Sequence, residues 1–102
     1  MSYTVMNRID VEAAEAEAFE KRFAASMSAT LPGVPGLVRS SLLRPQAQGA
    51  PYVAVMEFTG VDAFRAWMSS DSFKAAHGHS AGQEGTGGAH VEAFHTVAEV
   101  TA

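Results

Sequence analysis

The 102-residue sequence contains no cysteine. Disulfide bonds, thiolate catalysis, iron–sulfur clusters and cysteine-based zinc sites are therefore excluded. Positive charge is also scarce, because 7 Lys and Arg residues stand against 11 Asp and Glu residues, which gives a formal net charge of -4 at pH 7. Nucleic-acid binding and attraction to anionic membrane surfaces both need a cluster of basic residues. The sequence has no such cluster, so neither kind of partner is expected.

Long hydrophobic runs are missing as well. No apolar stretch approaches the roughly 20 residues of a transmembrane helix, and residues 1–10 hold no hydrophobic segment of a secretory signal. Together with the lack of cysteine, these absences lead us to expect a cytoplasmic protein. The hydrophobic content of 47% is typical of a globular chain. The length predicts a single domain that spans residues 1–102.

The pattern of apolar residues predicts four strands and two helices. Alternation of apolar and polar residues indicates the strands, and Phe19, Phe23 and Met27 form an apolar stripe of helical spacing in an Ala- and Glu-rich stretch. The expected strands cover 2–11, 36–44, 52–58 and 90–100, and the expected helices cover 12–29 and 61–68, with a short helical piece at 73–77 after a serine-rich break. This β-α-β-β-α-β order predicts an α+β, ferredoxin-like fold, in which both helices cover one face of an antiparallel sheet.

The other face of such a sheet has no helices to cover it. A second sheet packed against that face would bury it. We therefore expect a homodimer, in which two copies of the chain form a dimeric α+β barrel.

Asn7 interrupts the apolar face of the first strand. Tyr3, Val5 and Ile9 share that face because side chains alternate with a period of two. A buried amide without partners costs on the order of 1–3 kcal/mol. Two interpretations stay open: a hydrogen-bonded polar residue near a strand end, which the pattern alone favours, or an amide that donates into a cavity.

The second helix contains the only tryptophan, Trp67, about one helical turn from Phe64. The pattern alone favours a core residue, although Trp67 also precedes the helix break, where a cleft could open. His77 and His79 follow that break. A histidine at a helix end is commonly a cation that interacts with the helix dipole, whereas a neutral imidazole that faces a pocket is a common ligand of heme iron. The two histidines point apart on a helix, so one site can use only one of them.

Residues for acid–base or nucleophilic catalysis are not evident in the sequence. The glutamates of the first helix form a solvated face, and no serine has the G-x-S-x-G context of a hydrolase nucleophile. The five glycines of residues 78–89 match no phosphate-binding spacing, so we expect a mobile loop there. If the chain is an oxygenase, a cofactor or the substrate itself must activate oxygen.

Several motifs taken together resemble those of a known enzyme group, the heme-degrading monooxygenases of the antibiotic biosynthesis monooxygenase (ABM) superfamily. This group comprises the Isd-type enzymes of staphylococci and their mycobacterial relatives. The matching motifs are Asn7, EKRF at 20–23, P-G-x-x-G at 32–36, LLRP at 42–45 and AFRAWMSSDSFKAAHGH at 63–79. The last stretch is the most specific, because Trp67 precedes His77 by ten residues, as in the staphylococcal enzymes. The similarity covers nearly the whole chain.

The resemblance implies a role for each of these residues. His77 would be the axial ligand of heme iron, Asn7 would hydrogen-bond the bound oxygen, and Trp67 would press on the heme and keep it ruffled. Residues of the first helix would complete the heme site, with Phe23 and Met27 as pocket lining and Arg22 near the propionates.

The implied reaction is the oxygenation of heme, which would be both cofactor and substrate. The porphyrin ring would be opened with O2 and with electrons from a separate reductase or a small reductant, releasing iron and a bilin-type product. Ser26 replaces a basic residue of the mycobacterial relatives, and segment 78–89 differs from both branches. Contacts to the product and the position of ring opening therefore stay open.

Two other functions on the same fold also stay open. A cofactor-free quinol monooxygenase would take its electrons from a polyphenolic substrate that Asn7 and Trp67 orient. A non-catalytic heme-binding protein, a carrier or sensor, would keep His77 but leave the porphyrin ring intact. Fold alone does not decide between them.

Overall fold

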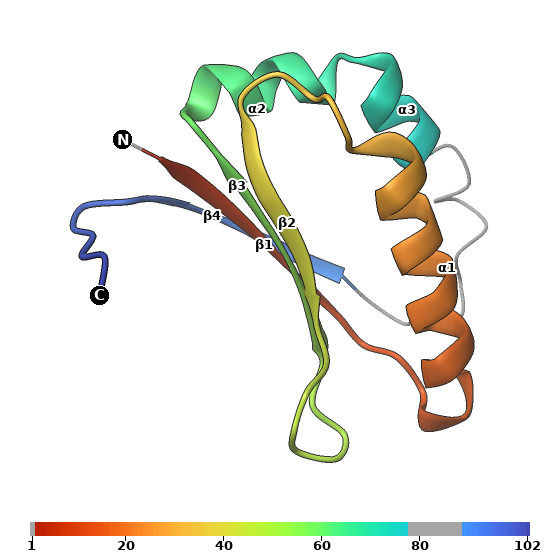
Figure 1. The fold of residues 1–102 in the computed structure, drawn as a ribbon. Helices are drawn as coiled ribbons and strands as arrows, with labels where there is room; N and C mark the ends of the chain where they lie inside the picture. The colour runs from red at the N-terminus through yellow and green to blue at the C-terminus, as the bar shows by residue number, and fades with distance from the viewer. Residues whose placement is uncertain (1, 78–88) are drawn as a thin grey trace.

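Residues 2–77 and 89–102 are described by the computed structural model, with the backbone alone for residues 75–77, 89 and 90. Figure 1 shows the order of the elements along the chain. They are β1 (Tyr3–Ile9), a 3-10 turn η1 (Ala13–Glu15), α1 (Ala16–Thr30), β2 (Leu37–Leu43), β3 (Tyr52–Phe58), α2 (Val61–Met68), α3 (Asp71–His77) and β4 (Ala89–His95). The Gly-rich segment expected to be a mobile loop lies, over residues 78–88, outside the described part of the chain.

The four strands form one open sheet in the order β2-β3-β1-β4, and each neighbouring pair is antiparallel. The helices lie on one face of this sheet, with α1 alongside it and α2 and α3 at one end (Figure 1). This arrangement confirms the predicted α+β, ferredoxin-like fold. The sheet of a single chain does not close, so a barrel would need a second copy.

Most predicted elements agree with the structure, but the last strand is shorter than expected. β4 ends at His95, which pairs with Tyr3 at the start of β1. The backbone N–H of Thr96 still donates to the carbonyl of Ser2 over 3.0 Å. The pairing of β4 with β1 stops at Tyr3, where β1 begins, and residues 96–102 form no strand.

The core lies between α1 and the sheet. Ile9, Phe19, Tyr52 and Ala54 form a buried cluster, in which the Phe19 and Tyr52 rings meet edge to face at 5.1 Å. The apolar stripe predicted for the first helix faces this cluster, because Phe19 is buried and Phe23 packs partly against it. A second group of aromatic rings lies under α2, where Phe58 is fully buried.

Gly36 allows α2 to lie close to the start of β2. Its φ of +77° is in the left-handed region, and a Cβ atom built there would lie 2.4 Å from the Cβ of Ala63. The carbonyl of Gly36 also accepts a 2.8 Å hydrogen bond from the backbone N–H of Thr59. The second glycine of the P-G-x-x-G motif is therefore required by close packing as well as by backbone conformation.

The opposite face of the sheet is not covered by any described helix (Figure 1). The strand registers place alternate residues on this face, including Met6, Val53, Val55, Leu43 and Phe94. Leu43 is 50% exposed and Phe94 is 46% exposed. Two ion pairs, Arg8 with Glu92 and Arg39 with Glu57, flank this apolar surface. We call it the uncovered sheet face.

Candidate functional site

Asn7 lies on the helix-covered face of the sheet, as predicted from the two-residue period. Its neighbours across the strands are Ala54 of β3 and Val91 of β4. The side-chain Oδ1 atom is buried and has no hydrogen-bond partner among the described residues. The unpartnered Oδ1 favours the interpretation of Asn7 as an amide that faces a ligand, and that role stays a prediction. An orphaned acceptor in a native structure calls for an explanation, and a bound ligand is one.

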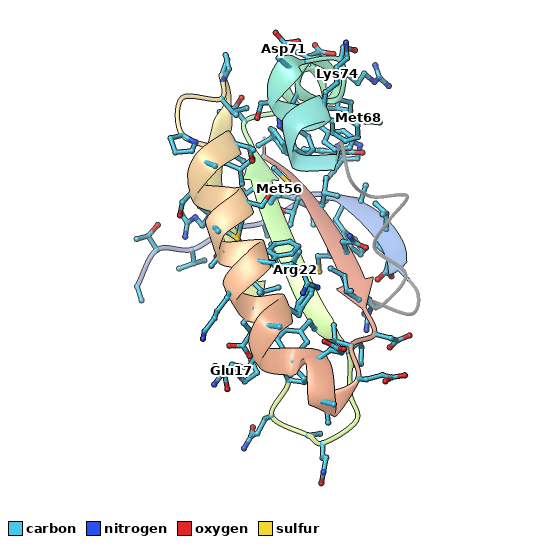
Figure 2. The ribbon with its side chains drawn as sticks, turned by 90° about the vertical axis from the view of Figure 1, so that its right-hand side faces the viewer. Glu17, Arg22, Met56, Met68, Asp71 and Lys74 are labelled. Carbon is cyan, nitrogen blue, oxygen red and sulfur yellow. The ribbon has the colours of Figure 1, made fainter. Side chains whose placement is uncertain are left out.

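The sheet beside Asn7 is open on its helix-covered side. Val91 lies directly opposite Asn7 and is 67% exposed, and Ala93, two residues further along β4, is exposed as well. Figure 2 looks onto this side and shows α1 and α3 in front of the sheet. The described helices therefore leave the floor formed by β1 and β4 accessible, with Asn7 at its inner edge. We call this surface the β1–β4 floor.

Trp67 is anchored in the aromatic group under α2. It is 6% exposed, and its ring centroid lies 5.8 Å from that of Phe58, 6.3 Å from that of Phe64 and 5.0 Å from that of Phe73. The interpretation of Trp67 as a core residue is confirmed by this burial. Its proposed contact with a ligand stays a prediction.

Asn7 and Trp67 lie on the same side of the sheet but at different positions along the strands. Phe58, which packs on Trp67, is paired with Tyr3, four residues before Asn7. Four residues of strand span about 13 Å. A ligand that reaches from Asn7 to the level of Phe58 must therefore extend a comparable distance along the sheet.

The residues of α1 assigned to the site lie at different depths. Phe23 is half-buried and its ring is 5.5 Å from that of Phe19, and Met27 is half-buried as well. Arg22 is exposed, and it has no ion pair among the described residues. In Figure 2 it lies on the flank of α1 toward β1. A free guanidinium at this position can bind an anionic group of a ligand.

His77 is the last residue of α3, a helix that contacts α1. Its side chain lies outside the described part of the structure, and so does the whole of His79. Within the described residues, no group of three or more His, Asp or Glu side chains could hold a metal ion. The assignment of His77 as an iron ligand therefore stays a prediction.

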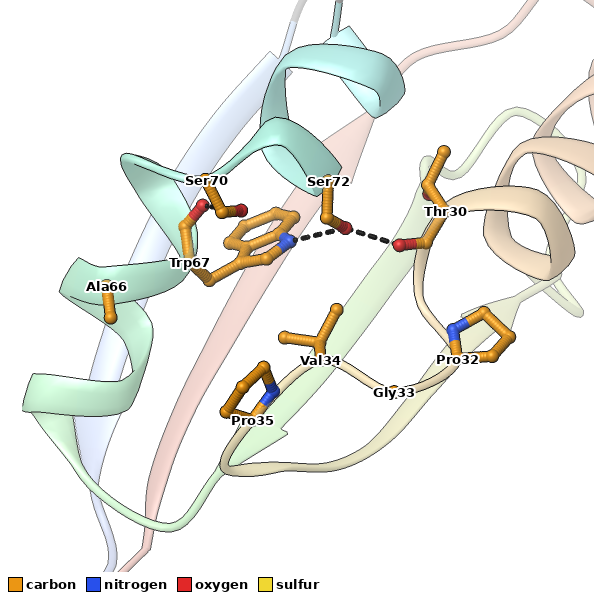
Figure 3. A pocket seen from close by; sticks show the side chains of 9 residues that line it. All are labelled: Thr30, Pro32, Gly33, Val34, Pro35, Ala66, Trp67, Ser70 and Ser72. Carbon is orange, nitrogen blue, oxygen red and sulfur yellow. Dashed lines mark hydrogen bonds between the residues drawn. The ribbon is translucent and has the colours of Figure 1, made fainter.

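The predicted break between α2 and α3 is present but shorter than expected, because Asp71 and Ser72 already belong to α3. The sequence did not predict the hydrogen bonds that the serines form. The Oγ of Ser70 accepts the backbone N–H of Phe73 at 3.2 Å and donates to the Trp67 carbonyl at 2.5 Å. The Oγ of Ser72 accepts the indole N–H of Trp67 at 3.2 Å and donates to the Thr30 carbonyl (Figure 3). Ser70 thus caps α3, and Ser72 connects Trp67 to the end of α1.

A second polar network lies away from Asn7, between α1 and the hairpin of β2 and β3. Arg44 donates to both carboxylate oxygens of Glu20, each over 2.7 Å, and the hydroxyl of Tyr52 donates to Oε2. The hydrogen bonds from Arg44 and then Tyr52 lower the pKa of Glu20 to about 2. The same carboxylate raises the pKa of the Tyr52 hydroxyl. This network links α1 to the hairpin of β2 and β3, and we do not assign it to the candidate site around Asn7.

Among the described residues, no helix is both long and apolar enough to cross a bilayer.

The sequence was compared with protein families and with curated proteins. The profile of the family described as antibiotic biosynthesis monooxygenase matches residues 2–79. No match is found among the curated proteins.

Solved structures with the same fold include both heme-binding and cofactor-independent proteins. The chain is similar to MhuD, a heme degrader from Mycobacterium tuberculosis solved with two hemes in its active site, at 30% identity and a TM-score of 0.79 over 97% of this chain and 99% of that one. An MhuD variant with two manganese protoporphyrin IX molecules per active site gives 29% identity and a TM-score of 0.83 over 98% and 99%. SnoaB, a cofactor-independent oxygenase from Streptomyces nogalater, gives 30% identity and a TM-score of 0.77 over 99% and 98%.

These similarities cover nearly the full length of each chain, and the family profile covers most of this one. The fold, the matched profile and the identities therefore lead to one conclusion: the chain belongs to the antibiotic biosynthesis monooxygenase family.

Proposed function

We propose that this protein is a heme-degrading monooxygenase of the Isd type, which binds heme through the axial ligand His77 and opens the porphyrin ring with O2. The observation that carries the proposal is the buried Oδ1 of Asn7, which has no partner among the described residues and lies beside the open β1–β4 floor. The similarity to MhuD, a heme degrader, supports the proposal.

The size of the site favours a large, flat ligand. About 13 Å of strand separates the level of Asn7 from that of the aromatic group around Trp67. A single phenolic ring is too short to span this distance, whereas a porphyrin with its side groups is long enough. The length of strand between the two levels therefore supports a ligand of the size of heme.

Each residue has a distinct task in this proposal. His77, at the end of α3, holds the iron, and the exposed Arg22 pairs with a propionate. Phe23 and Met27 of α1 form an apolar wall that excludes water. Trp67 presses on the macrocycle from the aromatic group that holds it.

Asn7 can serve as donor or acceptor. A 180° rotation of its amide exchanges Oδ1 and Nδ2, so the same buried position can present an N–H to the ligand. Heme supplies the oxygen chemistry when it is bound, with electrons from a reductase or a small reductant. No general acid or base from the protein is then required.

The experiment that tests ligand binding is a titration of the apoprotein with hemin, followed by the Soret band. The native protein should give a shifted band, and His77→Ala should weaken binding by about tenfold or more. His95→Ala is the matched control, because His95 is an exposed histidine at the end of β4 whose ring contacts Tyr3. If His77→Ala binds and degrades heme like the native protein, the axial assignment is wrong.

A cofactor-free quinol monooxygenase is the second candidate, and a specific observation favours it. As placed, Oδ1 of Asn7 is an acceptor, which suits the hydroxyl group of a polyphenol. The similarity to SnoaB, a cofactor-independent oxygenase, points the same way. Absence of hemin binding together with O2 uptake on a multi-ring hydroquinone would establish this function instead. Heme binding without ring opening would indicate a non-catalytic heme-binding protein.

We also propose that two copies associate through the uncovered sheet face to form the dimeric barrel. The face is apolar and partly exposed at Leu43 and Phe94, and its flanking ion pairs leave the centre free of charge. A second copy would bury this surface. The cytoplasmic location stays a prediction from the sequence.

A further inference from the structure

We propose that Ser72 is a positioning residue, which fixes the indole of Trp67 in one orientation by connecting it to the end of α1. This inference rests on the proposed function, because Trp67 is the residue assigned there to press on the ligand. Ser72 itself is not placed against the ligand.

The hydrogen-bond chain has only one possible direction. An indole N–H can only donate, and a backbone carbonyl can only accept. The single hydroxyl hydrogen of Ser72 must therefore point to the Thr30 carbonyl, while its oxygen accepts from Nε1 of Trp67 at 3.2 Å. The Thr30 carbonyl is among the last carbonyls of α1, which have no partner inside the helix. One hydroxyl thus accepts from the indole N–H of Trp67 and donates to the carbonyl of Thr30.

The hydrogen bond gives the indole a direction that apolar packing does not supply. The rings of Phe58, Phe64 and Phe73 surround it at 5.0 to 6.3 Å, and hydrophobic contacts are not directional. A flip of the ring would remove Nε1 from Ser72. The hydrogen bond to Ser72 therefore favours one orientation of the ring.

The indole also has space into which it could move. A cavity of about 280 Å³ adjoins it, between the turn after α1 and the break between α2 and α3 (Figure 3). Pro32, Val34 and Pro35 line the side of the cavity that belongs to the turn. Without the bond to Ser72, the ring could shift toward this space.

The same link also ties together the elements that carry the site. Ser72 belongs to the first turn of α3, which ends at His77, and Thr30 ends α1, which carries Phe23 and Met27. The orientation of Trp67 is therefore set relative to both helices.

Trp67 is the only tryptophan, so its spectrum tests the proposal without any ligand. Ser72→Ala should change the N–H band of the indole in ultraviolet resonance Raman spectra of the apoprotein and increase acrylamide quenching of fluorescence by about twofold. Ser72→Thr, which keeps the hydroxyl, should restore the native values. Ser69→Ala is the matched control, since the hydroxyl of Ser69 is exposed and donates to the Arg65 carbonyl, not to a group of Trp67. Native indole signals in Ser72→Ala would overturn the proposal.

Hemin turnover separates this proposal from the proposed function. We expect Ser72→Ala to lose about tenfold in the rate of heme loss at saturating hemin, with Ser72→Thr restoring it. A native rate despite a displaced indole would overturn the positioning role. If the native protein binds no hemin, the proposed function fails, while the spectra of the apoprotein still decide whether Ser72 fixes the indole.

A double variant covers the case in which Ser72→Ala does not fold. Trp67→Phe removes the N–H that needs an acceptor, so Ser72→Ala should cost less stability in that background than in the native one. If Ser72→Ala alone does not fold, the double variant should fold. Failure of both to fold, or equal costs in both backgrounds measured by thermal or urea unfolding, would contradict the link between the two side chains.

Discussion

A single side chain, that of Asn7, carries a buried oxygen that no described residue satisfies. A protein that served only stability would replace this amide with an apolar group, because a buried polar atom without a partner lowers the free energy of unfolding. We therefore expect that the amide lowers the stability of the protein and is present because it binds the ligand, as is common in binding sites.

The first prediction concerns the effect of Asn7 on stability and on turnover. Asn7→Leu should raise the free energy of unfolding of the apoprotein by about 1 kcal/mol and lower heme turnover by about 10²-fold. Urea unfolding and the rate of heme loss measure the two effects. Ser28→Ala, at an exposed position on α1, should change neither quantity. A large loss of stability in Asn7→Leu would show that the amide has a partner in the apoprotein.

The second prediction concerns Glu20, whose pKa of about 2 is well below its ordinary value of 4.5. Because the folded-state pKa is the lower one, the stabilisation is fully present above about pH 4.5 and is lost as the pH falls through about 2. Glu20→Gln should therefore be less stable at neutral pH and show a shallower loss of stability between pH 4.5 and 2.

Urea unfolding across that pH range checks the Glu20 prediction. Glu17→Gln is the matched control, because Glu17 lies on the same helix and forms only an exposed ion pair with Lys21 at 3.4 Å. An acid profile of Glu20→Gln that matches the native profile would refute the assignment.

At the scale of single residues, the position of Asn7 on the inner face of β1 could be predicted, because one polar residue interrupts an alternating apolar pattern. It could not predict the role of Ser72, because the carbonyl that this serine contacts belongs to Thr30, 42 positions away. Burial of Trp67 was equally predictable from the pattern, whereas the partner of its indole N–H was not.

Among the elements, the junction of β2 and α2 depends on a glycine that the helix approaches closely. Gly33 and Gly36 both have positive φ, but only Gly36 has a neighbour within reach of an added Cβ. Substitution of each glycine by alanine therefore distinguishes the cost of backbone strain, present at both positions, from the cost of a steric clash, present only at Gly36.

The third prediction uses this pair. Gly33→Ala should cost roughly 1–2 kcal/mol, from the left-handed backbone alone. Gly36→Ala should cost a further 1–3 kcal/mol or so, because the new methyl group collides with the Cβ of Ala63 and α2 must move. Unfolding experiments on both variants give the difference, and equal losses would mean that α2 does not pack as closely as the structure shows.

Most element boundaries could be predicted from local patterns. β3, expected at 52–58, matches residue for residue because its run of β-branched and aromatic residues is bounded by turn residues. The end of β4 could not be predicted, because its sequence keeps alternating after His95 while its pairing with β1 stops at Tyr3. Pairing, a property of the sheet, overrides the local pattern there.

For the molecule as a whole, the fold leaves one sheet face uncovered, and the proposed dimer buries it. The fourth prediction is that the native protein has about twice the 10.7 kDa mass of the chain in solution. Leu43→Glu should shift it toward the monomer, because burial of a carboxylate in an apolar interface is costly.

Light scattering after size-exclusion chromatography measures this mass. Met68→Glu is the matched control, because Met68 is similarly exposed at 46% but lies on α2, in the helical layer (Figure 2). A native protein that is monomeric, or a Leu43→Glu variant that stays dimeric, would contradict the proposed interface.

The central claim is that the chain opens the ring of heme. The most direct test supplies the native protein with one equivalent of hemin, a reductant and O2, and determines the mass of the pigment that remains. We expect loss of the Soret band, release of iron to a chelator and a pigment that has gained oxygen. Recovery of intact heme under these conditions would contradict it.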